Sequence, residues 1–402
     1  MTEGAPTAPR VPRVRRPRVV AAPVAAVEAP SAFAALGLSA RTLSALGAMG
    51  YAEPTAVQRE AIPPLLAGRD VVGQAQTGTG KTAAFGVPIV ERLDPTLHAV
   101  QAIVLTPTRE LANQVAAELT QICAGSGLRV AAVYGGVRMG PQLAALAGGA
   151  QIVVGTPGRV QDHMARGTLR LDRVRVAILD EADEMLDIGF KDDMERILRR
   201  TPRDRQTALY SATMPPFIRR MIRLYMREPV YVQIQPESAT VEIIEQVYYE
   251  VGERDKPRAL VELLEGLHLT RVLVFRRTQI GVDRLASTLE RRGISALPIH
   301  GGLRQNERDR VMEQFKAGEL RVLVATNVAA RGIDIHEVSH VVNYDFPQST
   351  EEYIHRIGRT GRAGREGTAV TFVSEWDFQD FAQLCEELGT TPRREVLTIY
   401  GG

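Results

Sequence analysis

One short glycine-rich stretch constrains this chain of 402 residues more than any other part of it. Residues 75–82 read Ala-Gln-Thr-Gly-Thr-Gly-Lys-Thr and lie between an apolar, strand-like segment and a helix-like one. In such a loop the backbone N–H groups turn toward phosphate oxygens, and the positive end of the following helix faces the same anion. Lys81 would reach the outer phosphates, and the Thr82 hydroxyl would bind Mg2+. The pattern predicts a nucleotide site, although Ala75 replaces the usual first glycine; the alternative is an ordinary glycine-rich turn.

The composition is typical of a globular protein without a strong overall charge. Hydrophobic residues make up 45% of the chain and charged residues 24%, and the formal net charge is only +2. No global basic field marks a nucleic-acid partner, so any such surface must be local. Cys123 and Cys385 are far apart and outside CxxC spacing, so we expect reduced thiols and a cytoplasmic protein. No run reaches the roughly 18 apolar residues of a membrane span.

The first 30 residues differ in composition from the rest. They are rich in Ala, Pro, Val and Arg, which cannot build a core, so we predict a disordered basic tail over 1–30. Such a tail could act as an electrostatic arm for RNA. The alternative is a targeting signal, since Arg15-Arg16 precedes an apolar run. That run is short and broken by Pro23, and an exported ATPase would find no ATP.

Apolar runs alternate with helix-like stretches after the tail, which predicts two α/β domains, each with a mostly parallel sheet covered by helices. The alternation lapses near Pro236 and then restarts without a second phosphate loop, so we expect one ATP site where the domains meet. The predicted divisions are a first domain over 31–235, a linker over 236–243, a second domain over 244–390 and a short tail over 391–402. The predicted strands are 103–105, 130–133, 152–154, 176–179, 207–210, 247–251, 272–275, 296–299, 322–325, 338–342 and 368–372.

A cluster of acids follows the strand expected near residue 179. The sequence Asp180-Glu181-Ala182-Asp183 would lie at the carboxyl end of that strand, where a doubly wound sheet binds its ligands. Asp180 is placed to hold Mg2+ opposite Thr82, and Glu181 to polarise the water that attacks the terminal phosphate. The alternative is an acidic helix start. The phosphate loop upstream favours the catalytic interpretation.

The phosphate loop, the Asp-Glu-Ala-Asp sequence and the ordered motifs after them together resemble the DEAD-box family of ATP-dependent RNA helicases. The resemblance runs from Phe33 to about Ser374, which is 342 of the 402 residues. It implies two tandem RecA-like domains, each a mostly parallel sheet flanked by helices. It also implies ATP and Mg2+ as ligands, a single RNA strand held through its backbone, local unwinding of short duplexes, and ATP hydrolysis stimulated by RNA.

The same resemblance implies the residues around the nucleotide. Residues 50–58 resemble the Q motif, in which Gln58 reads the adenine edge and Phe33 stacks on the ring, although Phe33 taken alone would be a core residue. The implied ATP-binding residues are Phe33, Gln58, Ala75, Gln76, Thr77, Gly78, Thr79, Gly80, Lys81, Thr82, Gly332 and Asp334, with Thr82 and Asp180 binding Mg2+. The implied catalytic residues are Lys81, Asp180, Glu181, Arg359 and Arg362, the two arginines reaching the phosphates from the second domain.

The implied RNA contacts lie on helix starts and tight turns, which offer N–H groups, hydroxyls and arginines to phosphates and read no base sequence. Taken singly, each could equally be a helix cap or a turn. The implied RNA-binding residues are Pro107, Thr108, Arg109, Gly135, Gly136, Thr156, Pro157, Arg159, Gln305, Arg308 and Thr326. The implied coupling residues are Asp183, Ser211, Thr213 and His355. Asn327 departs from the family, in which an aspartate is frequent at that position.

Two other functions stay open from the sequence. One is a DNA-directed helicase of the same superfamily, against which the Q motif and the complete motif VI over 355–362 argue. The other is an ATP-dependent RNA clamp or RNP-remodelling factor, in which RNA binding matters and unwinding does not. The sequence identifies no particular RNA, protein partner or pathway, and a monomer is the simplest expectation.

Overall fold

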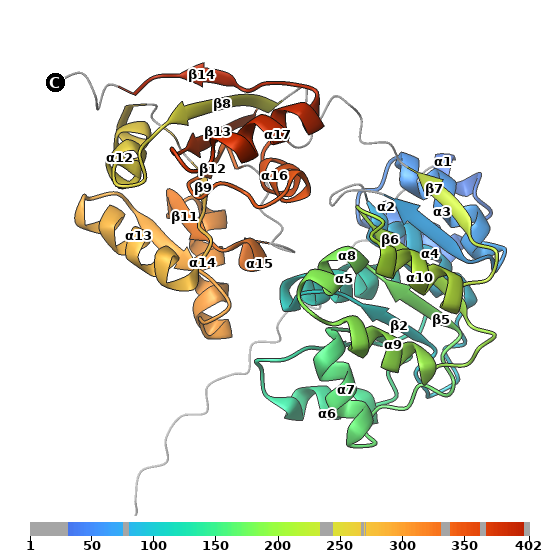
Figure 1. The fold of residues 1–402 in the computed structure, drawn as a ribbon. Coiled ribbons are helices and arrows are strands. Elements are labelled where there is room, and N and C mark those ends of the chain that lie inside the picture. Colours follow the sequence, from blue (N-terminus) through green and yellow to red (C-terminus); the bar gives the residue numbers. More distant parts are fainter. Residues whose placement is uncertain are drawn as a thin grey trace, which may run out of the picture.

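Two α/β domains follow one another along the chain (Figure 1). The computed structural model describes residues 31–74, 80–233, 244–266, 269, 271–330, 338–361 and 367–397. These residues form two seven-stranded sheets, and every strand pairing recorded in them is parallel. The predicted fold class is therefore confirmed. Within the described ranges, no helix has the length and apolar character needed to cross a bilayer.

The first sheet has the strand order β3-β4-β2-β5-β6-β1-β7. Its strands are β1 (Val71–Gln74), β2 (Ala102–Leu105), β3 (Val130–Val133), β4 (Ile152–Gly155), β5 (Val176–Leu179), β6 (Gln206–Ser211) and β7 (Val230–Gln233). The central strands β2, β4 and β5 are buried throughout because helices cover both faces, which explains their continuous apolar sequences. Since β1 and β5 flank β6 and run parallel, the loop after β1 and the acids after β5 emerge at the same edge of the sheet.

The helices of the first domain divide between two apolar cores, one on each face of the sheet. They are α1 (Ser31–Ala34), α2 (Ala40–Ala48), α3 (Ala56–Leu66), α4 (Lys81–Arg92), α5 (Arg109–Ile122), α6 (Met139–Ala147), α7 (Pro157–Ala165), α8 (Ala182–Asp187), α9 (Lys191–Arg199) and α10 (Pro216–Tyr225). Helices α3, α4 and α5 bury their apolar residues on one face, and α7, α9 and α10 bury theirs on the other. Each core removes many Val, Ile and Leu side chains from water, and this burial is the main favourable contribution to folding.

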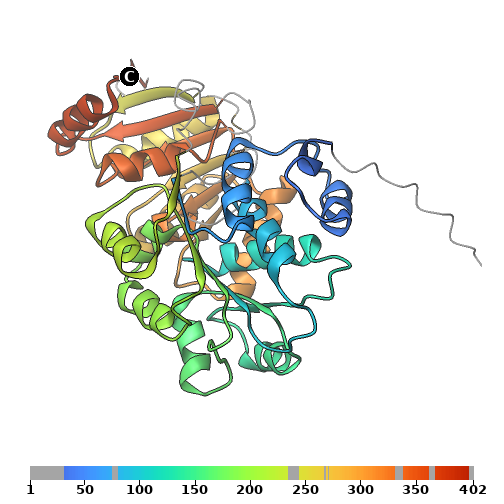
Figure 2. The same cartoon turned by 90° about the vertical axis from the view of Figure 1, so that its right-hand side faces the viewer.

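The second sheet repeats the design with the order β10-β11-β9-β12-β13-β8-β14. Its strands are β8 (Ile244–Glu250), β9 (Val272–Phe275), β10 (Ala296–Ile299), β11 (Val322–Ala325), β12 (His340–Asn343), β13 (Gly367–Val373) and β14 (Arg393–Glu395). Its helices are α12 (Lys256–Gly266), α13 (Gln279–Arg291), α14 (Gln305–Ala317), α15 (Asn327–Ala330), α16 (Thr350–Ile357) and α17 (Phe378–Leu388). Helices α12 and α13 cover one face and the others pack on the opposite face. Figure 2 shows the blue N-terminal helices and the red C-terminal elements on opposite sides of the view.

Every strand predicted from the sequence overlaps an observed strand, but two edge strands were not predicted. Both β7 and β14 are short, carry polar or exposed side chains and lie at sheet edges, where one side of the strand needs no apolar partner. Strand β14 lies within 391–402, the range expected to be a tail. The predicted basic tail over 1–30 and linker over 236–243 fall outside the described residues, and the domain divisions stay predictions.

One buried carboxylate connects β1, the strand before the predicted phosphate loop, to its neighbours. Asp70 precedes β1, is 3% exposed, and accepts hydrogen bonds from the backbone N–H groups of Thr207 (2.8 Å) and Arg227 (2.7 Å). Thr207 lies in β6, and Arg227 lies in the turn that leads to β7. Asp70 therefore holds the three strands in register at the edge opposite the phosphate loop, a role that no sequence motif signals.

The substitution Asp70→Ala should lower the free energy of unfolding of the first domain by about 2–5 kcal/mol, because two buried N–H groups lose their acceptor. Urea unfolding followed by circular dichroism measures this change. The exposed Asp172 provides the control, and Asp172→Ala should change the stability by less than about 0.5 kcal/mol. Equal effects of the two substitutions would contradict the assignment of Asp70.

Candidate nucleotide site and interdomain cleft

Lys81 and Asp180 meet at the carboxyl edge of the first sheet. Lys81 is the first residue of α4, and Asp180 directly follows β5. The Lys81 Nζ atom lies 3.6 Å from Asp180 Oδ1, and the two side chains are only 8% and 3% exposed. Thr82 is the next residue of α4 and is half-buried. Residues 75–79 lie outside the described residues, so the structure places the helical half of the predicted phosphate loop.

The carboxylates beside Lys81 are buried with unsatisfied oxygens. Asp180 Oδ1 and Glu181 Oε2 have no hydrogen-bond partner within the described part of the chain. Burial raises the pKa of Asp180 and, with the added repulsion of Glu184, raises the pKa of Glu181 well above its usual value, while Lys81 opposes both shifts. Burial alone would lower the pKa of Lys81, but the surrounding carboxylates, Asp180 foremost, raise it.

This donor set fits Mg2+. Magnesium keeps several waters and takes only one or two carboxylates together with substrate phosphates, so it does not need a cage of protein ligands. The described ranges hold no group of three or more His, Cys, Asp or Glu side chains that could enclose a metal. Asp180, with its unsatisfied oxygen, and the Thr82 hydroxyl are the matching oxygen donors.

Glu181 has a backbone conformation that is rare for a residue with a side chain. Its φ of 52° and ψ of 54° lie in the left-handed region, and only Glu228 shares a positive φ among the described non-glycine residues. Holding such a conformation costs of the order of 1 kcal/mol and is most common at functional sites. The turn at Glu181 starts α8 and turns the chain abruptly at the end of β5.

Gln58 joins the Q motif to the end of the phosphate loop. Its Oε1 atom accepts a hydrogen bond from the Thr55 N–H group (2.9 Å), and its Nε2 atom donates to the Gly80 carbonyl oxygen (3.0 Å). Gly80 has a φ of 86°, and a Cβ atom there would lie 2.6 Å from Gln58 Nε2. Phe33 is fully buried, and its ring meets that of Tyr51 edge-to-face with the ring centroids 6.1 Å apart. The stacking of Phe33 on adenine stays a prediction.

The predicted coupling residues of the first domain are bonded to one another. Thr213 donates to Asp183 Oδ2 through its backbone N–H (2.8 Å) and its hydroxyl (3.0 Å). Ser211 Oγ accepts the Asp183 N–H group at 3.2 Å. Because Asp183 is two residues from Glu181, this network links the acidic site to the end of β6.

Arg359 approaches the acidic site from the second domain. It follows α16, is 5% exposed, and donates from Nε to the His355 carbonyl oxygen (3.2 Å). Its positive charge acts on Glu181 and lowers that pKa, against the larger effects of burial and the neighbouring acids. Arg362, Gly332 and Asp334 lie outside the described residues, so the roles assigned to them stay predictions.

A buried arginine that sequence analysis left without a role connects two helices of the second domain. Arg356 is 2% exposed, donates to Asn327 Oδ1 (2.8 Å) and to the Asp345 carbonyl oxygen (2.7 Å), and pairs with Glu352. Burial lowers its pKa to about 10. Asn327 donates in turn to Glu352 Oε1 at 2.7 Å. The network therefore ties α15 to α16, and the amide of Asn327 serves as both acceptor and donor in it.

Hydrogen bonds and an ion pair cross between the two domains. Arg109 donates to Gln305 Oε1 (3.2 Å), Gln305 donates to Glu110 Oε1 (3.3 Å), and Arg308 pairs with that same oxygen at 3.0 Å. Arg308 is 9% exposed as a side chain, so this ion pair is largely shielded from water. Glu110 is the member that sequence analysis did not single out.

A pocket of about 510 Å3 lies at this crossing and is lined by both domains. Of the predicted RNA-binding residues, it brings together Pro107, Thr108, Arg109, Gly135, Thr156, Arg159 and Arg308. Gln305 bonds to Arg109, the Arg109 guanidinium covers Gly136, and Pro157 is the first residue of α7. Thr326 is buried, and its N–H donates to the Ile299 carbonyl oxygen (3.3 Å).

Comparisons with known proteins cover both domains. The family model described as DEAD/DEAH box helicase matches residues 55–221, and the helicase conserved C-terminal domain matches 255–364. DEAD-box ATP-dependent RNA helicase CshA of Geobacillus kaustophilus is 49% identical over 362 residues, which are 90% of this chain and 77% of that protein. S. cerevisiae Dbp5 bound to RNA and ADP BeF3 is 35% identical, with a TM-score of 0.83 over 91% of this chain and 95% of that one. Mss116p bound to ssRNA and AMP-PNP is 28% identical, with a TM-score of 0.81 over 91% and 78%.

The substitution Gly80→Ala should weaken ATP binding at least about tenfold, because the added methyl group would displace the Gln58 amide and strain a left-handed residue. Titration with a fluorescent ATP analogue measures the affinity. Gly37→Ala is the matched control, since Gly37 also has a positive φ but no atom within 4 Å of the added methyl group. If both variants bind the analogue equally well, Gln58 and Gly80 do not shape the site.

Proposed function

The chain belongs to the DEAD/DEAH box helicase family, and from this premise we propose that it is an ATP-dependent RNA helicase that holds single-stranded RNA across both domains and separates short duplexes locally. The relative from Geobacillus kaustophilus carries that activity in its name, and the two solved relatives of similar fold are bound to RNA and a nucleotide analogue.

The observation that carries this proposal is the contribution of both domains to shared sites. Arg359 of the second domain acts electrostatically on the buried Glu181 of the first. The pair of Glu110 and Arg308 closes the neighbouring pocket from the two sides. Because ATP and RNA would each contact both domains, each ligand favours the same closed arrangement. Binding of one must then strengthen binding of the other.

The chemistry of ATP hydrolysis follows from the charges at the carboxyl edge of the first sheet. Lys81 neutralises the outer phosphates, and Glu181 orients the attacking water and accepts its proton. Mg2+ held by Thr82 and Asp180 would offset further negative charge on the phosphates. Arg359 stabilises the charge that develops in the transition state, a contribution that exists only when the domains are closed.

RNA binding is assigned to the pocket between the domains. Its arginines and its helix starts at α5 and α7 offer charge-assisted hydrogen bonds and N–H groups to phosphates, which hold a strand without reading its sequence. The effect of hydrolysis would reach the rest of the first domain through the hydrogen bonds of Asp183 with Ser211 and Thr213, which link the acidic site to the end of β6. A strand bent to fit the closed pocket cannot remain paired, so a short duplex opens.

Two further parts of the proposal concern where and in what form the protein works. We place it in the cytoplasm, where ATP and RNA are available and where the free thiols of Cys123 and Cys385 stay reduced. We propose a monomer, since one chain supplies both halves of the nucleotide site and of the RNA pocket.

The substitution Glu181→Gln should leave ATP and RNA binding almost unchanged but lower RNA-stimulated turnover by about two to four orders of magnitude, because the amide cannot accept a proton. Steady-state phosphate release and filter binding measure the two properties. Glu386→Gln, on the exposed surface of α17, is the control and should keep full turnover. Near-normal hydrolysis by Glu181→Gln would remove that residue from its assigned role.

ATP turnover should rise at least about tenfold with single-stranded RNA and much less with DNA of the same length, since the 2′-hydroxyl distinguishes the two. A rate that responds equally to both nucleic acids would argue against an RNA helicase. Release of a labelled strand from a short duplex tests unwinding directly. Tight RNA retention with a non-hydrolysable ATP analogue, together with no strand release, would favour the clamp instead.

A further inference from the structure

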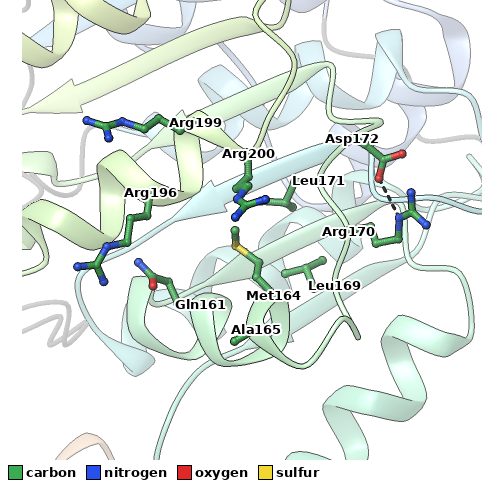
Figure 3. A pocket seen from close by; sticks show the side chains of 10 residues that line it. All are labelled: Gln161, Met164, Ala165, Leu169, Arg170, Leu171, Asp172, Arg196, Arg199 and Arg200. Carbon is green, nitrogen blue, oxygen red and sulfur yellow. Dashed lines mark hydrogen bonds and ion pairs between the residues drawn. The ribbon is translucent and has the colours of Figure 1, made fainter.

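A second pocket, of about 710 Å3, opens on the first domain outside both candidate sites (Figure 3). It lies between the C-terminal end of α7, the segment that follows it, and the C-terminal turn of α9. It shares no lining residue with the interdomain pocket or with the nucleotide site. The helicase activity proposed above therefore makes no use of it.

The floor of this pocket is apolar. Leu169 and Leu171 are each only 4% exposed and belong to the core on that face of the sheet, and Met164 packs against the same core. Met164 points toward the middle of the pocket in Figure 3. A flexible methionine over two leucines adapts to side chains of different shape, a property of surfaces that bind peptides.

The rim is basic. The lining residues include four arginines and a single acid, which are Arg170, Arg196, Arg199, Arg200 and Asp172. Arg170 pairs with Asp172 at 3.2 Å and Arg196 with Asp193 at 3.7 Å, and Arg170 and Arg196 are 81% and 63% exposed. Exposed pairs of this kind contribute about 0–1 kcal/mol each, so their arginines can exchange partners at little cost.

Arg200 has the position best suited to an incoming carboxylate. Its guanidinium lies at the centre of the view in Figure 3, above Met164, and no ion pair is recorded for it within the described ranges. Arginines in the last turn of a helix also offset the helix dipole, which would account for Arg196 and Arg199 on α9. The helix dipole of α9 does not account for Arg170, which lies in the segment after α7.

We propose that this pocket binds an acidic peptide segment of a partner protein, with an apolar side chain seated on Met164, Leu169 and Leu171. Its carboxylates would pair with Arg170, Arg196 and Arg200, since Arg199 already pairs with Glu195 at 2.6 Å. Bidentate pairing with carboxylates is the contact that arginine makes best, and arginine is enriched where protein interfaces concentrate their binding energy. A nucleic acid fits less well, because none of the lining residues is aromatic and a base would find no ring on which to stack.

This pocket and the interdomain pocket both use residues of α7 but share no lining residue. Thr156 and Arg159, at the start of α7, line the interdomain pocket, whereas Met164 and Ala165, at its end, line this one. Near the middle of α7, Gln161 lines this pocket and Asp162 lines the interdomain one. Because no lining residue is shared, an RNA strand and a peptide can be bound at the same time. The peptide would attach the enzyme to a partner without competing with RNA.

Fluorescence anisotropy with the full chain tests this proposal. The probes are labelled peptides of about a dozen residues that alternate Asp and Glu around a central Leu, Met or Phe, and a peptide with Gly at the centre is their control. We expect at least one probe to bind saturably with a Kd below about 100 μM, and the Gly peptide to bind clearly more weakly. Absence of saturable binding by all three probes would overturn the proposal.

The substitution Arg200→Glu should weaken peptide binding at least about tenfold. Arg258→Glu, which makes the same charge change on the exposed surface of α12, should leave it unchanged. A circular dichroism spectrum and a urea unfolding midpoint that match those of the unmodified protein show that Arg200→Glu is folded. Equal weakening by both variants would mean nonspecific charge attraction, and would reject the site.

A parallel experiment with RNA tests whether the ligand of this pocket is an acidic peptide or a nucleic acid. Binding of a labelled oligouridine strand, measured with the same variants in the presence of an ATP analogue, should not change with Arg200→Glu. If that substitution weakens oligouridine as much as it weakens the acidic peptide, the pocket extends the RNA path and the proposed occupant is wrong. Failure of the helicase assays above would leave the peptide result unaffected.

Discussion

The buried pairing of one lysine with several carboxylates is the interaction on which the rest of the site depends. Among the described residues of the first domain, Lys81 is the only cation recorded in contact with Asp180, and both side chains are almost wholly removed from water. Burying an ion is costly unless opposite charge is close by. Lys81 offsets only part of the negative charge of Asp180, Glu181 and Glu184. The remaining charge makes the site receptive to a metal ion and to an arginine from outside the domain.

The first domain holds this charge in place through its sheet. Strands β1 and β5, which run parallel on either side of β6, bring Lys81 and Asp180 to one edge of the sheet. At the other edge, Asp70 joins β1 to β6 and to the turn before β7. The abrupt turn at Glu181 stores a small amount of strain that the surrounding packing maintains. The geometry around Lys81 and Asp180 thus depends in part on a buried polar contact at the opposite edge of the sheet.

The second domain places two buried arginines in and just after α16, and one of them, Arg359, carries a charge that acts on Glu181. Arg356 is held by hydrogen bonds to Asn327 and to the Asp345 carbonyl oxygen and by an ion pair with Glu352. In the sequence it follows His355 and precedes Arg359 by three residues. Where the family often has an aspartate, Asn327 donates to one neighbour and accepts from another, which an ionised carboxylate could not do. The interdomain pair of Glu110 and Arg308 adds a contact that both RNA and domain closure must accommodate.

The sequence alone determined the α/β class and the positions of most strands along the chain, and it predicted the nucleotide and acidic residues, because those features depend on local periodicity and on short motifs. Helix starts such as Thr108 and Thr156 were readable for the same reason. Only the tertiary structure decided that Gln58 braces Gly80, that Glu181 has a left-handed backbone, and that Glu110 pairs with Arg308. These contacts join residues that are 22 to 198 positions apart or depend on packing around a single turn, and no local pattern encodes them. The pocket with Arg170 and Arg200 on its rim belongs to the same class, since three segments must fold together before its arginines share one surface.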